Sequence, residues 1–282
     1  MSPVKEPRFF AYEGEKVAFA GPGDELFANS SITEIDKYRA LFDGVKHEVA
    51  IGEASPNYLY IAKAPERIHH HIPKAKLIAI LRNPVERAYS NFMHNVRDGF
   101  EPLADFGQAL REEQNRIHNN WASRWHYRKQ GFYYAQLVKY FESFERDQIK
   151  IILYEEFGAN TKAEMRDLFQ FLGVDDKFVP DLSTRYNMSG IPQNQVVNSI
   201  LKHRGLQKFG KRFIPAKLRR IALNARNNNL VKPTISSEIR KEMMDGYKED
   251  IQQLERLIER DLSVWMRTED RGSANQLHAG RP

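Results

Sequence analysis

Apolar runs and helical periodicities alternate along the 282-residue chain. Two short, near-continuous apolar runs, Lys76–Leu81 and Ile149–Tyr154, are typical of strands buried on both faces of a parallel sheet. Val49–Ile51 predicts a third, weaker strand. The clearest helical patterns lie between and after these runs, at Pro84–Val96, Tyr134–Phe144, Lys162–Leu172 and Glu238–Leu262. This order of strands and helices predicts the α/β class.

The last of these helices carries one continuous apolar stripe. Ser236 or Ser237 can cap its N-terminus. The apolar residues recur at steps of three and four, at Ile239, Met243, Tyr247, Ile251, Leu254, Ile258 and Leu262. Such a stripe predicts a helix that docks on the core and closes a domain. We expect one domain over residues 1–267, with a mostly helical excursion over 98–130 and a disordered polar tail over 268–282.

Composition excludes several classes of site. The chain has no cysteine, which excludes disulfides, thiolate metal sites and cysteine nucleophiles. No metal-binding cluster is apparent, so we expect no metal. No apolar run approaches the roughly 20 residues of a membrane-spanning helix. The opening MSPVKEPRFF lacks the pattern of a signal peptide, so we expect a cytoplasmic protein.

The positive charge is concentrated in one block. Leu182–Ser237 holds no acidic residue, and its eleven cations are Arg185, Lys202, Arg204, Lys208, Lys211, Arg212, Lys217, Arg219, Arg220, Arg226 and Lys232. Because the net charge is +6, the rest of the chain carries about −5. A block of one sign favours an anionic partner such as a nucleotide, an acidic glycan or a phospholipid surface. The alternative is a solvated surface without a partner.

The stretch after Lys76–Leu81 predicts an abrupt strand-to-helix turn. Asn83 is a good N-cap, Pro84 suits the first helical position, and Glu86 can close a capping box. The turn leaves Arg82 at the carboxyl edge of the strand, where open α/β sheets bind ligands. The helix then divides into an apolar arc and a polar arc, the latter made of Arg87, Ser90, Asn91, His94 and Arg97.

The Arg82 guanidinium and the Ser90 hydroxyl together suit a doubly charged phosphate. Periodicity alone favours a blander interpretation, an amphipathic helix with a solvated polar face. However, R-N-P-x-x-R-x-x-S after an apolar strand resembles the 3′-phosphate motif of sulfotransferases that use 3′-phosphoadenosine 5′-phosphosulfate (PAPS). The variant RNPVERAYSNFMH is similar to the heparan-sulfate-type and bacterial branch. The resemblance implies that Arg82 and Ser90 bind the donor's 3′-phosphate, and that His94 lies near the acceptor.

Other stretches resemble the same branch, from Lys5 to about Trp265. KEPRFF matches an element whose glutamate is the acceptor's base, which implies that role for Glu6 and makes Lys5 a candidate to stabilise charge. GEASPNYLY matches an element that carries a sulfate-contacting lysine in the glycan enzymes, but here Ala54 stands in its place. Arg185 falls near where relatives close a loop on the 3′-phosphate, although their K-G-x motif is not found.

The family opens with a strand and a K-x-G-T-T-[ST] loop that binds the 5′-phosphosulfate, and neither is found in this chain. The early glycine cluster Ala20–Leu26 lacks the lysine and the hydroxyls. We therefore expect a P-loop-NTPase-like parallel sheet without its first strand and loop, and Met1 as an internal methionine of a longer protein. We also expect impaired activity and poor stability, because a single lost preorganised donor can cost about 3–4 kcal/mol.

The resemblance implies transfer of a sulfuryl group from PAPS to a hydroxyl or amine, releasing adenosine 3′,5′-bisphosphate. The acceptor is a carbohydrate, a lipid or another small molecule, and peripheral membrane contact stays open. One alternative is an inactive member of the same family. Another is a non-enzymatic binder of nucleic acid or other anions through the basic block, although no nucleic-acid partner is expected. A nucleotide kinase would need a Walker loop, which is not visible.

Overall fold

The structure is a computed structural model that describes residues 1–181, 190–192, 230–231 and 233–267. Arg185, most of the basic block and the tail after residue 267 lie outside the described residues.

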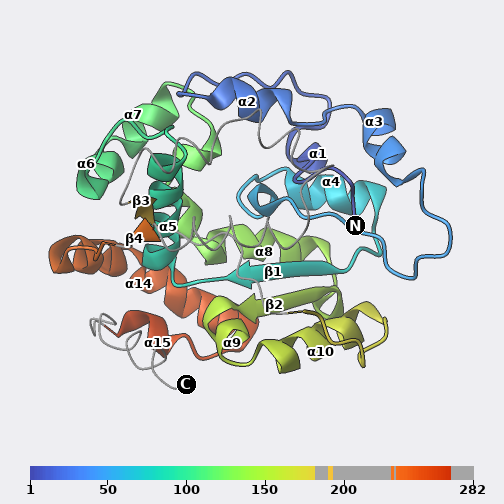
Figure 1. The fold of residues 1–282 in the computed structure, drawn as a ribbon. Helices are drawn as coiled ribbons and strands as arrows, with labels where there is room; N and C mark the ends of the chain where they lie inside the picture. The colour runs from blue at the N-terminus through green and yellow to red at the C-terminus, as the bar shows by residue number, and fades with distance from the viewer. Residues whose placement is uncertain (182–189, 193–229, 232, 268–282) are drawn as a thin grey trace.

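The two strong strand predictions are confirmed. β1 (Leu77–Leu81) and β2 (Ile149–Leu153) pair in parallel, with Leu77 opposite Ile149 and Leu81 opposite Leu153. Figure 1 shows the two arrows side by side between layers of helices. A second, short pair consists of β3 (Ile191–Pro192) and β4 (Leu230–Val231), which are antiparallel. Parallel strands joined through helices give the predicted α/β class.

The predicted strand at Val49–Ile51 is wrong. This segment is an irregular loop in which Val49 and Ile51 are exposed, so it has neither a ladder partner nor a covering layer. The prediction of burial on both faces also fails for β1. Leu81 faces the core, but Ile78 and Ile80 on the opposite face are 41% and 56% exposed. α9 (Tyr154–Ala159) and α10 (Thr161–Leu172) contact β2 instead.

The closing helix behaves as its apolar stripe predicts. α14 (Ser237–Ile258) begins at Ser236, whose hydroxyl accepts the amide of Ile239 at 3.2 Å. It packs against α8 (Tyr133–Ser143) and α5 (Pro84–Arg97), and its inward residues are buried. The helix ends at Ile258 rather than Leu262, because Glu259 adopts a left-handed conformation with φ 54°. Leu262 is nevertheless buried, just before α15 (Ser263–Met266).

The remaining elements surround this centre. The N-terminal helices α1 (Phe9–Tyr12), α3 (Ile35–Arg39) and α4 (Ala64–His71) share a small aromatic cluster that includes Phe9, Phe10 and Tyr38. The other helices and 3-10 turns are α2 (Asp24–Asn29), α6 (Phe106–Arg111), α7 (Glu113–His118), Ala40–Phe42, Pro56–Tyr58, Ser123–Trp125, Lys129–Gly131 and Arg146–Gln148. Within the described residues, no helix has the length and apolar character needed to cross a membrane.

Candidate functional site

The turn between β1 and α5 holds Arg82 in a fixed position. Asn83 caps α5, its side-chain oxygen accepting the amides of Val85 and Glu86 at 3.0 and 3.2 Å. Its side-chain amide donates to the carbonyl of Trp265 at 3.0 Å, and the hydroxyl of Tyr133 donates to the carbonyl of Arg82 at 3.0 Å. The backbone from which the Arg82 side chain projects is therefore anchored by two other elements.

The Arg82 guanidinium lies at the protein surface between an aromatic ring and a carboxylate. It sits 5.0 Å from the centre of the Tyr154 ring, and its Nη2 is 3.4 Å from Oε2 of Glu86. The side chain keeps 23% of its surface exposed. Cation–π contact holds the fork in place, while the long distance to Glu86 leaves that ion pair weak.

A second guanidinium, which the sequence analysis missed, reaches the same carboxylate. Arg240 of α14 donates from Nη2 to Oε1 of Glu86 at 2.6 Å. Its Nε is buried without a hydrogen-bond partner among the described residues. The capping box predicted for Glu86 is wrong, since the amide of Asn83 donates to Glu155 instead. Glu86 thus lies between two cations from different elements, where it attracts both.

Ser90 follows Glu86 by one helical turn on the same side of α5. It is 9% exposed, and no hydrogen bond to its hydroxyl is found within the described part of the chain. Arg82, Glu86 and Ser90 are spaced four residues apart. The structure therefore gathers two guanidinium groups and a hydroxyl along the first turns of α5, with a single carboxylate among them.

Two further residues of the polar arc predicted for α5 bind carbonyl groups of the protein itself. Arg87 donates to the carbonyl of Tyr127, and Asn91 donates to the carbonyl of Arg124 at 2.9 Å. These side chains hold residues 121–131, here called the 121–131 segment, against α5. His94 lies in the last turn of α5, half-buried.

The KEPRFF stretch forms a second polar cluster. The Glu6 carboxylate is 2.9 Å from Nη2 of Arg8 and 3.7 Å from Nζ of Lys5, which is largely exposed. Glu6 and Arg8 both adopt left-handed backbone conformations, with φ 53° and 57°. Such conformations are strained in residues other than glycine, asparagine and aspartate, and they cluster at functional sites. Arg8 is also stacked 4.2 Å from the centre of the Phe27 ring.

A half-buried carboxyl that the sequence analysis did not single out lies beside Glu6. Burial raises the pKa of Glu53, and the negative charge of Glu6 adds to this shift. The hydroxyl of Ser55 donates to Glu53 at 2.8 Å, and the hydroxyl of Tyr58 donates to its other oxygen. The only signal for Glu53 in the sequence is the spacing of its partners, because Ser55 and Tyr58 follow it by two and five residues.

Arg124 connects the KEPRFF cluster to α5. Burial lowers the pKa of its guanidinium, and the like charge of Arg8 acts in the same direction. Its Nη1 is buried without a hydrogen-bond partner among the described residues, and the guanidinium stacks 4.0 Å from the centre of the Phe100 ring. Its carbonyl accepts the side-chain amides of Asn91 and Asn95, which flank His94 on α5. Arg124 therefore lies between Arg8 and the part of α5 that carries His94.

Two further expectations from the sequence concern Arg185 and metal binding. Arg185 lies outside the described residues, so its position relative to Arg82 stays open. Among the residues that the structure describes, no three acidic or histidine side chains gather as metal ligands.

The comparisons with known proteins agree on one family. A model described as "Sulfotransferase family" matches residues 9–178. Mouse carbohydrate sulfotransferase 15 is 32% identical over 121 residues, which cover 38% of this chain and 22% of that protein. Human bifunctional heparan sulfate N-deacetylase/N-sulfotransferase 2 is 30% identical over 135 residues, which cover 43% of this chain and 14% of that protein. The match therefore spans less than a quarter of these curated relatives.

A solved structure resembles the chain over nearly its whole length. The crystal structure of a sulfotransferase from Alicyclobacillus acidocaldarius has a TM-score of 0.72 and 34% sequence identity. The likeness covers 94% of this chain and 87% of that one.

Proposed function

This chain belongs to the sulfotransferase family, and from that premise we propose that it transfers a sulfuryl group from PAPS to a hydroxyl or amine of a carbohydrate or other small acceptor. The observation that carries the proposal is the pair of guanidiniums, Arg82 and Arg240, that flank one carboxylate near the hydroxyl of Ser90, for which the described residues show no hydrogen-bond partner. A ribose 3′-phosphate is a doubly charged acceptor of hydrogen bonds, and these groups offer the matching donors. The phosphate would replace Glu86 as their partner.

The proposed chemistry assigns roles to the KEPRFF cluster. In sulfuryl transfer the acceptor's oxygen or nitrogen bonds to sulfur while the bond between sulfur and the bridging phosphate oxygen breaks. The bonding electrons leave with adenosine 3′,5′-bisphosphate, and the acceptor's proton must go to a base. We assign that base to Glu6, with His94 as the second candidate, and Lys5 to stabilising charge on the transferred group. The match to the sulfotransferase family and the names of the carbohydrate-modifying relatives support the reaction class, whereas the roles of these residues rest on the resemblance of their motifs.

Calorimetric titration with adenosine 3′,5′-bisphosphate tests the proposal. Adenosine 5′-monophosphate, which lacks the 3′-phosphate, should bind at least about tenfold more weakly, because charge-assisted hydrogen bonds are worth about 1.5–3 kcal/mol. Arg82→Gln and Ser90→Ala should remove most of this preference, and Arg240→Gln should reduce it. Arg39→Gln, at an exposed arginine of α3, is the matched control and should change nothing. Equal affinity for the two nucleotides, or an unchanged preference in Arg82→Gln, would refute the assignment.

A further inference from the structure

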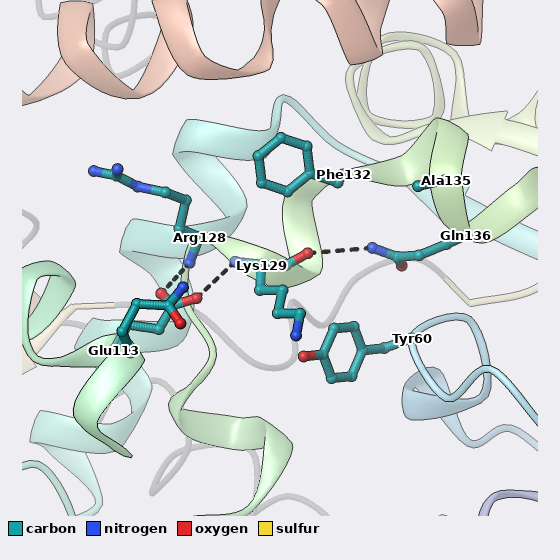
Figure 2. Close-up of a pocket in the computed structure, with 8 residues that line it drawn as sticks. Tyr60, Glu113, Arg128, Lys129, Phe132, Ala135 and Gln136 are labelled. Carbon is teal, nitrogen blue, oxygen red and sulfur yellow. Dashed lines mark hydrogen bonds between the residues drawn. The ribbon is translucent and has the colours of Figure 1, made fainter. Parts of the chain in front are cut away.

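A cavity of about 400 Å³ lies beside the N-terminus of α8, apart from the residues assigned to donor and base. Its lining comes from Tyr60, Glu113, Gln114, Arg128, Lys129, Phe132, Ala135 and Gln136. Figure 2 shows Tyr60, Lys129 and Phe132 gathered around it, while the Arg128 guanidinium points away. Arg82, Ser90, Glu6 and His94 are not among its lining residues. The proposed transfer reaction therefore leaves this cavity without a role.

The hydrogen-bonding direction of Tyr60 can be assigned from its neighbour. Nε2 of His126 lies 3.2 Å from the carbonyl of Trp121, which can only accept, so Nε2 carries the proton. Nδ1 must then accept, and the hydroxyl of Tyr60 at 2.8 Å donates to it. The Tyr60 oxygen is left with lone pairs only, so toward the cavity it can act as an acceptor of hydrogen bonds.

The hydrogen-bonding roles of the Gln136 side chain follow from its neighbours as well. Its Nε2 donates to the carbonyls of Gln130 and Lys129 at 3.2 and 3.5 Å. Its Oε1 therefore remains as an acceptor at the cavity wall. Two acceptors on one wall suit a ligand that carries several hydroxyl donors.

The cavity also presents one cation. The backbone amides of Arg128 and Lys129 donate to the buried Glu113 at 2.6 and 2.8 Å, so that carboxylate is already engaged. The Arg128 guanidinium pairs with Glu242 of α14. The exposed Lys129 ammonium has no ion-pair partner within the described residues, and Figure 2 shows it directed toward Tyr60. A single ammonium suits a single anionic group.

The apolar part of the lining is rigid. The Phe132 ring lies 5.0 Å from the Tyr247 ring of α14, at an interplanar angle of 62°. Ala135 adds a methyl group beside it. An aromatic ring that is fixed in this way can pack against the C–H face of a ligand at low entropic cost.

We propose that this cavity binds an acidic sugar unit of the acceptor, at a subsite outside the transfer centre. The sugar's hydroxyls donate to Tyr60 and Gln136, its carboxylate or sulfate faces Lys129, and its C–H face packs on Phe132. The choice of a sugar as the substrate that receives the sulfuryl group rests on the proposed function. The pattern of hydrogen-bonding groups, by contrast, rests on the cavity alone. The subsite would thus select acceptors that carry an acidic unit in addition to the one that is sulfated.

Ligand-observed and protein-observed NMR titrations test the proposal with three probes. Methyl β-D-glucuronide and glucose 6-sulfate carry the two anionic groups, and methyl β-D-glucoside is the neutral match. Both acidic probes should bind, with affinity about five- to tenfold higher than the neutral one. Lys129→Gln should remove that difference, and Lys129→Glu should make the acidic probes bind more weakly than the neutral one. Lys162→Gln, at an exposed lysine of α10, should leave all three unchanged.

Three results would overturn the proposal: equal binding of the neutral probe, no binding of either acidic probe, or wild-type discrimination in Lys129→Gln. If only one acidic probe shows the preference, that probe identifies the anionic group. Titration of the same proteins with adenosine 3′,5′-bisphosphate separates this outcome from the proposed function. Lys129→Gln should keep nucleotide binding, and Arg82→Gln should keep binding of the acidic probes.

Discussion

At the scale of single residues, the candidate site combines two carboxyl groups with different surroundings. Glu6 is paired with Arg8, whereas the pKa of the half-buried Glu53 is raised by desolvation and by the charge of Glu6. A base must be ionised before it can accept a proton, and burial disfavours the ionised form of Glu53. This contrast favours Glu6 as the base and gives Glu53 the task of holding the segment through Ser55, which accepts the amide of Arg8 at 3.1 Å.

We predict that Glu6→Gln lowers sulfuryl transfer from PAPS by about 100-fold or more, since general-base catalysis contributes about 10²–10⁴-fold. Its affinity for adenosine 3′,5′-bisphosphate should not change. Both are measured on one preparation, by release of the bisphosphate in the presence of a panel of acceptors and by calorimetry. Glu25→Gln, at an exposed position of α2, is the isosteric control. Transfer that is lost in Glu53→Gln but retained in Glu6→Gln would move the base to Glu53.

The sequence predicts the role of a single residue correctly where that role depends on residues close to it in the chain. The N-caps Asn83 and Ser236 are confirmed because a cap depends on residues two or three positions away. The partner of the Glu86 carboxylate could not be predicted from neighbouring residues. Its partner Arg240 lies 154 residues along the chain, and no local pattern predicts which of two competing contacts a carboxylate takes.

At the scale of elements, the 121–131 segment is the least predictable part of the site. It contains no long regular element, so its position depends on side chains of α5 that bind its carbonyl groups, among them Arg87 and Asn91. The sequence pattern placed these side chains in a polar arc and left open whether that arc faces a ligand or solvent. Helical periodicity identifies such a face, but it cannot distinguish a ligand from a protein segment as the face's partner.

His126 makes the stability of this segment depend on pH. Burial lowers its pKa from 6.5 to about 4, and the positive charge of Lys129 acts in the same direction, whereas the hydrogen bond to the carbonyl of Trp121 opposes the shift. The unfolded chain takes up a proton near pH 6.5 and the folded chain only near pH 4, so the stabilisation is complete above about pH 6.5 and is lost as pH falls toward 4. We predict that the free energy of unfolding drops by about 2 kcal/mol between about pH 7 and pH 5 from this group alone.

Urea unfolding at the two pH values measures this contribution as a difference between variants. His126→Gln should abolish about 2 kcal/mol of the pH dependence, whereas His118→Gln, at an exposed histidine of α7, should retain it. The difference between variants is needed because burial also raises the pKa of Glu53 and Glu113, which act with the opposite sign. Identical pH dependence in wild type and His126→Gln would contradict the assignment of the neutral tautomer.

At the scale of the whole molecule, α14 joins elements that are far apart in the sequence. The hydroxyl of Tyr247 donates to the carbonyl of Arg128 at 2.7 Å, and Asp250 accepts the amides of Tyr134 and Ala135 at the start of α8. A carboxylate at this end of a helix is favoured by the helix dipole. The apolar stripe predicted that α14 docks, but the surface it docks on was not predictable, because Gly131 has no side chain and therefore gives no hydrophobic signal.

Gly131 provides the sharpest test of this docking. A Cβ at this position would lie 2.5 Å from the hydroxyl oxygen of Tyr247 and 2.7 Å from the ring carbon that bears it. Tyr247 is fully buried and its ring packs on Phe132, so it cannot move aside without opening the α8–α14 interface. We predict that Gly131→Ala lowers the free energy of unfolding by about 1–3 kcal/mol, the usual effect of overpacking.

Gly246→Ala is the matched control, because its Cβ meets no atom within 4 Å and alanine favours the helix by about 0.5–1 kcal/mol. Equal free energies of unfolding of the two variants in urea would mean that α14 is not closely packed against Gly131.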